Sequence, residues 1–118
     1  MARVVALVPD LMFGSRVQSM LEAAGHEVTL TGAEDEARTE AEFADVLVVD
    51  LTTDIVDGVM LVDSMRAGGE LQGIRTLAFY SHVEADTRAR AQEAGFDEVV
   101  PRSRMAREGA ALVERLLA

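Results

Sequence analysis

The stretch Asp45–Gly58, with the sequence DVLVVDLTTDIVDG, decides the predicted fold. An unbroken apolar run, Val46–Val49, ends in the carboxylate of Asp50, and a polar loop then leads to Asp57 and Gly58. Continuous Val and Leu residues between polar flanks are typical of a strand that is buried on both faces of a parallel sheet. In open α/β sheets, ligands and reactive groups gather just beyond the carboxyl ends of such strands. Asp50 is therefore the first candidate functional residue.

The composition indicates a single folded domain. The chain has 118 residues, of which 49% are hydrophobic and 4% aromatic, so we expect one domain over residues 1–118 with an aliphatic core and no output domain. There is no Cys, which excludes disulfides and thiolate metal sites. The apolar run after Arg3 is too short for a signal peptide or a membrane span. We therefore expect a cytoplasmic protein without a membrane partner.

The charge argues against a nucleic-acid partner. The net charge is −10 and all eleven basic residues are Arg, so the basic footprint that neutralises phosphates is not visible. The phosphate-binding and nucleophile motifs GxGxxG, GKS or GKT, and GxSxG are also missing. Two His residues without Cys do not suffice for a transition-metal site. We expect His26 to be exposed in a turn and His82 to lie near the rim of the Asp50 pocket.

Four further strand candidates surround the first, and helix candidates follow all five. The other strands are predicted at Arg3–Val8, Glu27–Thr31, Arg75–Phe79 and Glu98–Val100. The helices are predicted at Phe13–Ala24, Glu34–Glu42, Gly58–Met65 and Glu84–Ala94, and after Ser103. Asp10 and Ser103 are the expected N-caps of the first and last helix, and Gly25 the expected C′ residue. Strands that alternate with helices predict a parallel sheet covered on both faces.

Two segments carry a family resemblance: Ala44–Gly58, ADVLVVDLTTDIVDG, and His82–Ser103, HVEADTRARAQEAGFDEVVPRS. They are similar to response-regulator receiver domains, the CheY-like modules of bacterial two-component signalling, and the resemblance covers nearly the whole chain. In that family the phosphoacceptor aspartate ends the third strand, eight residues before the glycine of a DG pair, as Asp50 does before Gly58. The resemblance implies a flavodoxin-like (βα)5 three-layer sandwich with a five-stranded parallel sheet in the order 2-1-3-4-5.

Three positions depart from the family pattern and resemble its pseudo-receiver branch. The acidic pair that holds Mg²⁺ at the end of strand one in receivers is Val8-Pro9 here, with Asp10 just after it. The family's Ser or Thr at the end of strand four aligns with Tyr80, next to Ser81, and its strand-five Lys aligns with Arg102. The resemblance therefore implies a pocket made of Asp10, Asp50, Thr52, Tyr80, Ser81 and Arg102.

The candidate metal ligands are Asp10, Asp50 and the carbonyl of Thr52. Aspartyl phosphorylation needs a nucleophilic carboxylate, a bridging divalent ion and groups that spread the transferred charge. Mg²⁺ demands near-octahedral oxygen ligation, and Pro9 fixes the backbone just before Asp10. We therefore expect Mg²⁺ to bind weakly or not at all, no other cofactor, no catalytic residue, and no enzymatic activity.

The pocket residues also have structural interpretations. Asp50 could cap its loop or pair with Arg102, and Arg102 could hold an anion bidentately or be a Lys replacement in a chain without Lys. Tyr80 could be a rotating switch or a core residue, and Ser81 a phosphoryl donor or a turn residue. We expect a charge-assisted contact between Arg102 and Asp50, because a partly buried carboxylate needs a partner.

Two functions remain open. The first is a stand-alone atypical receiver that acts through a protein partner, either a sensor kinase or a downstream target. Its expected interface, or a homodimer interface, lies between Arg88 and Leu117 and includes four arginines: Arg88, Arg90, Arg104 and Arg107. The alternative is a small flavodoxin-like domain that binds phosphate or a cofactor, or an enzyme subunit.

Overall fold

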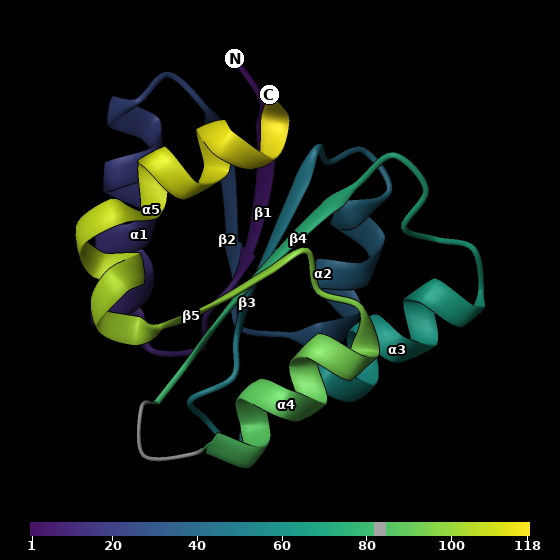
Figure 1. Cartoon of the computed structure of the whole chain (residues 1–118). Helices are drawn as coiled ribbons and strands as arrows, with labels where there is room; N and C mark the ends of the chain where they lie inside the picture. Colours follow the sequence, from purple (N-terminus) through teal and green to yellow (C-terminus); the bar gives the residue numbers. More distant parts are fainter. Residues whose placement is uncertain (82–84) are drawn as a thin grey trace.

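The computed structural model describes residues 1–81 and 85–118. Within them, five strands alternate with five helices (Figure 1). The strands are β1 Arg3–Leu7, β2 Glu27–Thr31, β3 Val46–Asp50, β4 Arg75–Tyr80 and β5 Glu98–Pro101. The helices are α1 Leu11–Ala23, α2 Glu34–Ala41, α3 Gly58–Ala67, α4 Ala85–Ala94 and α5 Arg102–Leu117. The expected position of His82, and the expected start of a helix at Glu84, lie outside the described residues.

The strands form one parallel sheet in the order β2-β1-β3-β4-β5, which confirms the predicted fold. The central strand β3 pairs with β1 and β4, and all five of its residues are buried. This burial explains why Val46–Val49 is a continuous apolar run, since helices cover both faces of the strand.

Two helical layers enclose the sheet and divide the core into two clusters. Helices α1 and α5 cover one face, and α2, α3 and α4 cover the other (Figure 1). Because successive side chains of a strand alternate between faces, Val46 and Val48 pack toward α1 and α5, whereas Leu47 and Val49 pack toward α2, α3 and α4. Asp50 continues the first series, so it belongs to the α1 and α5 face of the sheet.

The last helix begins earlier than predicted. Its first residue is Arg102, and its N-cap is Pro101, not Ser103. Pro101 has φ −63° and ψ 150°, an extended conformation that suits proline and ends β5 directly at the helix. Ser103 therefore lies in the first turn, and no side chain caps this N-terminus. The correction matters for the site, because Arg102 belongs to the helix and not to the strand.

The expected exposure of His26 is wrong. His26 is only 7% exposed. The residue before it, Gly25, is the predicted C′ residue and adopts φ +95°. The Nδ1 atom accepts a hydrogen bond from Ala2 N at 3.2 Å, and Nε2 lies 2.9 Å from Oε1 of Glu114 near the end of α5. Nε2 has no hydrogen-bond partner of suitable geometry in the described residues, although Oε1 of Glu114 lies close to it. His26 thus joins the start of β1 to the last helix.

None of the helices in the described part of the chain is both long enough and apolar enough to cross a membrane.

Candidate functional site

Asp50 lies at the carboxyl end of the central strand and is 2% exposed. Its Oδ1 atom accepts two hydrogen bonds from Thr52, one from the backbone N at 2.7 Å and one from Oγ1 at 2.6 Å. No residue in the described ranges donates a hydrogen bond to Oδ2. The carboxylate therefore orders the loop that follows it, as in the loop-capping interpretation.

Gly58 allows helix α3 to begin directly against the end of β3. A Cβ atom at this position would overlap Cγ1 of Val49 and lie 2.8 Å from Cδ2 of Leu51. Both neighbours are buried aliphatic side chains, so they have little room to move. Asp57 caps the same helix by accepting a hydrogen bond from Met60 N at 3.0 Å. The spacing between Asp50 and Gly58 thus has a packing cause.

Asp10 is the N-cap of α1, as predicted. Its Oδ1 accepts hydrogen bonds from Met12 N at 2.9 Å and Phe13 N at 3.0 Å. The hydrogen bond from Phe13 is the main reason why the pKa of Asp10 is lowered, with smaller contributions from Met12 and from the charge of Arg102. Oδ2 lies 3.6 Å from Nη2 of Arg102. Both oxygens of Asp10 therefore have partners within the protein.

The expected contact between Arg102 and Asp50 is wrong. Arg102 lies over the ring of Phe13, with Cζ 4.2 Å from the ring centroid, and its ion-pair partner is Asp10. Phe13 in turn packs against Phe79, with ring centroids 5.1 Å apart. Because Arg102 starts α5, it is placed beside α1, while Thr52 already satisfies Oδ1 of Asp50. The stacking follows from the attraction between a guanidinium and an aromatic face.

Three of the predicted pocket residues lie together, and Tyr80 does not. Thr52, Ser81 and Arg102 line one groove of about 550 Å³. Tyr80 is 8% exposed and packs in the core cluster on the side of α2, α3 and α4, which supports its interpretation as a core residue. Sequence reasoning missed Arg16, which also lines the groove. Its position one helical turn after Phe13 was a signal that could have found it.

Within residues 1–81 and 85–118, no group of three or more His, Cys, Asp or Glu side chains is arranged to hold a metal ion.

Comparisons with known proteins agree on the architecture. No family model and no curated protein sequence matches the chain. The receiver domain of the Francisella response regulator 1452 is 17% identical with a TM-score of 0.85, covering 98% of this chain and 96% of that one. The chemotaxis response regulator CheY4 of Vibrio cholerae is 19% identical with a TM-score of 0.84, covering 98% of each chain. The chain has the receiver fold.

A third structure with the receiver fold comes from Pseudomonas aeruginosa. It is the receiver domain of the sensor histidine kinase PA1611, described with a magnesium ion coordinated in its active site cleft. It is 18% identical to this chain with a TM-score of 0.84, and covers 98% of this chain and 97% of its own.

The arginines of the expected interface differ in their surroundings. Arg88 and Arg90 are exposed on α4. On α5, Arg104 and Arg107 both approach the carboxylate of Glu108, at 3.7 Å and 3.6 Å. The positive charge of these two residues is therefore partly neutralised within the helix.

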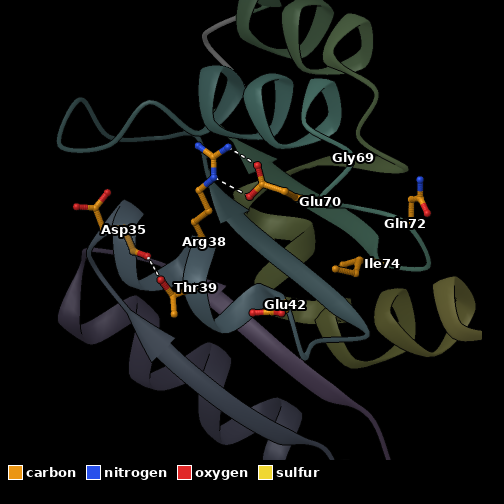
Figure 2. Close-up of a pocket in the computed structure, with 8 residues that line it drawn as sticks. All are labelled: Asp35, Arg38, Thr39, Glu42, Gly69, Glu70, Gln72 and Ile74. Atoms are coloured by element: carbon orange, nitrogen blue, oxygen red, sulfur yellow. Dashed lines mark hydrogen bonds and ion pairs between the residues drawn. The ribbon is translucent and has the colours of Figure 1, made fainter.

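Another cavity lies away from Asp50. Its volume is about 720 Å³, and it is bounded by α2 and by the segment between α3 and β4 (Figure 2). Arg38 spans it as a bidentate ion pair with Glu70, in which Nε donates to Oε1 at 2.8 Å. Figure 2 shows the side chains of Asp35 and Glu42 lying apart from this pair. The cavity therefore lacks a converging set of polar groups that would define a ligand.

The ion pair predicts a measurable titration. The hydrogen bond from Arg38 is the main cause of the lowered pKa of Glu70, so Arg38→Met should return that pKa toward 4.5. A lowered carboxyl pKa means that the pair stabilises the protein above the pKa of the unfolded state, and that this contribution disappears as the pH falls through the folded-state pKa. Carboxyl NMR titration measures the shift. An unchanged Glu70 titration in Arg38→Met would show that the ion pair does not form in solution.

Proposed function

We propose that the chain is an atypical receiver domain that acts in two-component signal transduction by binding proteins, without phosphorylation of Asp50. The fold supports the receiver part of this proposal. The residues at the end of β1 support the atypical part. In a conventional receiver these positions would hold the divalent cation, and here they are Val8 and Pro9.

The end of β1 offers no carboxylate pair for a divalent cation. Val8 is 2% exposed and belongs to the core, and Pro9 comes next in the chain. The nearest acidic residue, Asp10, uses one oxygen to cap α1 and holds the other near Arg102. Mg²⁺ needs several oxygen ligands in near-octahedral geometry. The donor set around Asp50 does not fit that requirement, and this single observation carries the proposal.

The contacts of Asp50 favour a structural role over a nucleophilic one. A phosphoacceptor needs an accessible oxygen and nearby groups that stabilise the transferred charge. Asp50 is only 2% exposed, its Oδ1 accepts both hydrogen bonds of Thr52, and Arg102 is held against Phe13. Asp50 thus fixes the loop between β3 and α3, and the domain is a constitutive binder in place of a switch.

The partner we propose is a protein in the cytoplasm, either a sensor kinase or a downstream target. The surface we assign to it includes α4, β5 and α5, where Arg88 and Arg90 are exposed. Only Ala91 and Ala94 of α4 are buried, so most of this helix is available for contact. Exposed arginines suit an acidic partner and are enriched in binding hot spots. The same surface is our candidate for a homodimer.

Incubation with acetyl phosphate and Mg²⁺, followed by intact-mass spectrometry, tests the proposal. We expect no mass increase, while a conventional receiver domain in the same experiment gains one phosphoryl group. The Asp50→Asn variant is the matched control, since it removes the acceptor that the resemblance implies without changing the shape of the side chain. A phosphoryl adduct on the unmodified chain that disappears in Asp50→Asn would refute the proposed function.

A further inference from the structure

We propose that the open edge of β2, with the groove beside it, docks an extended and basic segment of a partner protein. The groove holds about 400 Å³ and lies where the strands begin, next to the ends of α1 and α2. Its walls include Glu22, Glu27, Val28, Thr29, Glu40 and Phe43. Asp50 lies at the other end of the strands, and β5 at the other edge of the sheet. The inference therefore goes beyond the proposed function.

Phe43 places an exposed aromatic ring at this groove. The chain contains four Phe and one Tyr, and four of these five aromatic residues are buried: Phe13, Phe79, Phe96 and Tyr80. Phe43, by contrast, is 66% exposed. Exposed aromatic side chains are enriched among the residues that anchor protein interfaces. In a domain that buries its other aromatic residues, Phe43 is the natural anchor for a partner.

The edge of β2 offers backbone hydrogen bonds beside this ring. β2 is the last strand on its side of the sheet and pairs only with β1 among the described residues. The N–H of Glu27 and the carbonyl of Thr31 bond to the residues just before and just after β1, each at 2.9 Å. Because alternate residues of a strand direct their backbone groups to opposite sides, Val28 and Leu30 face away from β1. Their N–H and C=O groups are available to an added strand.

The charge of the groove favours a basic partner. Three carboxylates line it, those of Glu22, Glu27 and Glu40. Arg3 also lines it and forms an ion pair with Glu27 at 3.3 Å, in which both side chains are largely exposed. Glu40 has no ion-pair partner in the part of the chain that the structure describes. Arginine or lysine side chains of a partner would complement the remaining negative charge.

A second copy of the chain does not fit this surface. Pairing β2 with β2 of another copy would bring Glu27 and the other carboxylates of both grooves together, and like charges across an interface oppose association. Charged residues on short edge strands commonly prevent such self-pairing. A strand of opposite charge does not meet this repulsion, so the edge selects a basic partner.

Amide hydrogen exchange of the chain alone tests the geometry of the edge. We expect the amides of Val28 and Leu30 to exchange fast and those of Thr29 and Thr31 to exchange slowly, because only the second pair faces β1. Equal protection of these four amides would mean that the edge is already covered, and would overturn the inference.

Titration with a short capped peptide that alternates arginine with valine, followed by amide NMR at constant ionic strength, tests the docking. We expect saturable shifts confined to residues 3–5, 22, 27–31 and 40–44, and slower exchange at Val28 and Leu30. Two control peptides should not bind: one with glutamate in place of arginine, and one whose backbone nitrogens are methylated and cannot donate. Equal binding of the methylated peptide would show that charge alone holds the peptide, and would contradict pairing with the strand edge.

Substitutions locate the peptide on the protein. Phe43→Ala should weaken binding about tenfold, because it removes the anchor, and Glu40→Gln about threefold, because it removes a peripheral charge. The matched controls Ile55→Ala and Glu93→Gln remove an exposed apolar side chain and a carboxylate that do not line the groove, and should bind like the unmodified chain. Urea unfolding checks that these surface substitutions leave the fold intact.

Two results of these measurements would overturn the basic partner. Equal losses in the groove variants and their controls would mean a diffuse attraction between the peptide and an acidic protein. Shifts of the β2 amides that change when the chain alone is diluted would mean that the occupant is a second copy. Neither result bears on the acetyl phosphate experiment, which reports only on Asp50.

Discussion

Gly58→Ala should lower the free energy of unfolding by about 1–3 kcal/mol, and the melting temperature by on the order of 10 °C. The added Cβ overlaps Cγ1 of Val49, a fully buried side chain of the central strand, and crowds Leu51. To accept it, α3 must move away from β3 or the strand must shift against its neighbours. The helix propensity of Ala offsets only about 1 kcal/mol of this cost. Urea unfolding and thermal melts measure the effect.

Gly109→Ala is the matched control for this prediction. The new Cβ would also meet side-chain atoms, but these are the flexible ends of Met20 and Met105. Methionine adapts to new neighbours at low cost, and Ala favours the interior of α5 over Gly. We therefore expect Gly109→Ala to be neutral or stabilising. Equal destabilisation by the two substitutions would mean that rigid packing at the end of β3 is not the cause.

His26→Ala should be the second large loss, about 2–4 kcal/mol in the free energy of unfolding. The substitution leaves the N–H of Ala2 without its acceptor in a buried position and removes a ring that is 7% exposed. It also removes the contact to Glu114, which connects the end of α5 to the start of the sheet. Urea unfolding gives the value, and amide hydrogen exchange shows whether β1 and α5 open first.

Two further variants separate the causes of the His26 effect. His26→Asn keeps an acceptor near the position of Nδ1, so it should restore part of the loss. Glu114→Gln keeps the shape of the partner but removes its charge, and because that side chain is 59% exposed we expect a change within about 1 kcal/mol. If His26→Ala unfolded at the same urea concentration as the unmodified chain, the buried contact with Ala2 would have no energetic role.

The fold could be predicted from local patterns, whereas the partners of single side chains could not. The apolar run Val46–Val49 and the alternation of strands with helices identify a parallel sheet, and Asp10 before an amphipathic segment identifies a helix cap. Such signals lie within a few residues of the feature they predict. The resemblance to receivers added the strand order and directed attention to Asp50.

Arg102 shows why the contacts of the functional site were harder to predict than the fold. Its predicted partner was Asp50. Helix α5 starts at Arg102, earlier than predicted, and this start places the side chain over Phe13. A long side chain chooses among several neighbours that are far apart in sequence. The prediction for His26 was wrong for a related reason, because Ala2 and Glu114, both far from it in sequence, contact its ring. Neither contact leaves a local sequence signal.

The layer formed by α1 and α5 joins two helices that are far apart in sequence, and this affects how the domain can fold during synthesis. One half of the core needs Phe13 and Val17 from the first helix together with Met105 and Leu112 from the last. The helices of the opposite layer end at Ala94, whereas this layer lacks its second helix until residues 102–117 have been synthesised. Until α5 is added, the sheet residues Val46 and Val48 lack the side chains of Met105 and Leu112 that share their core cluster in the complete fold. Apolar sheet surface that is uncovered in this way favours aggregation until α5 packs on it.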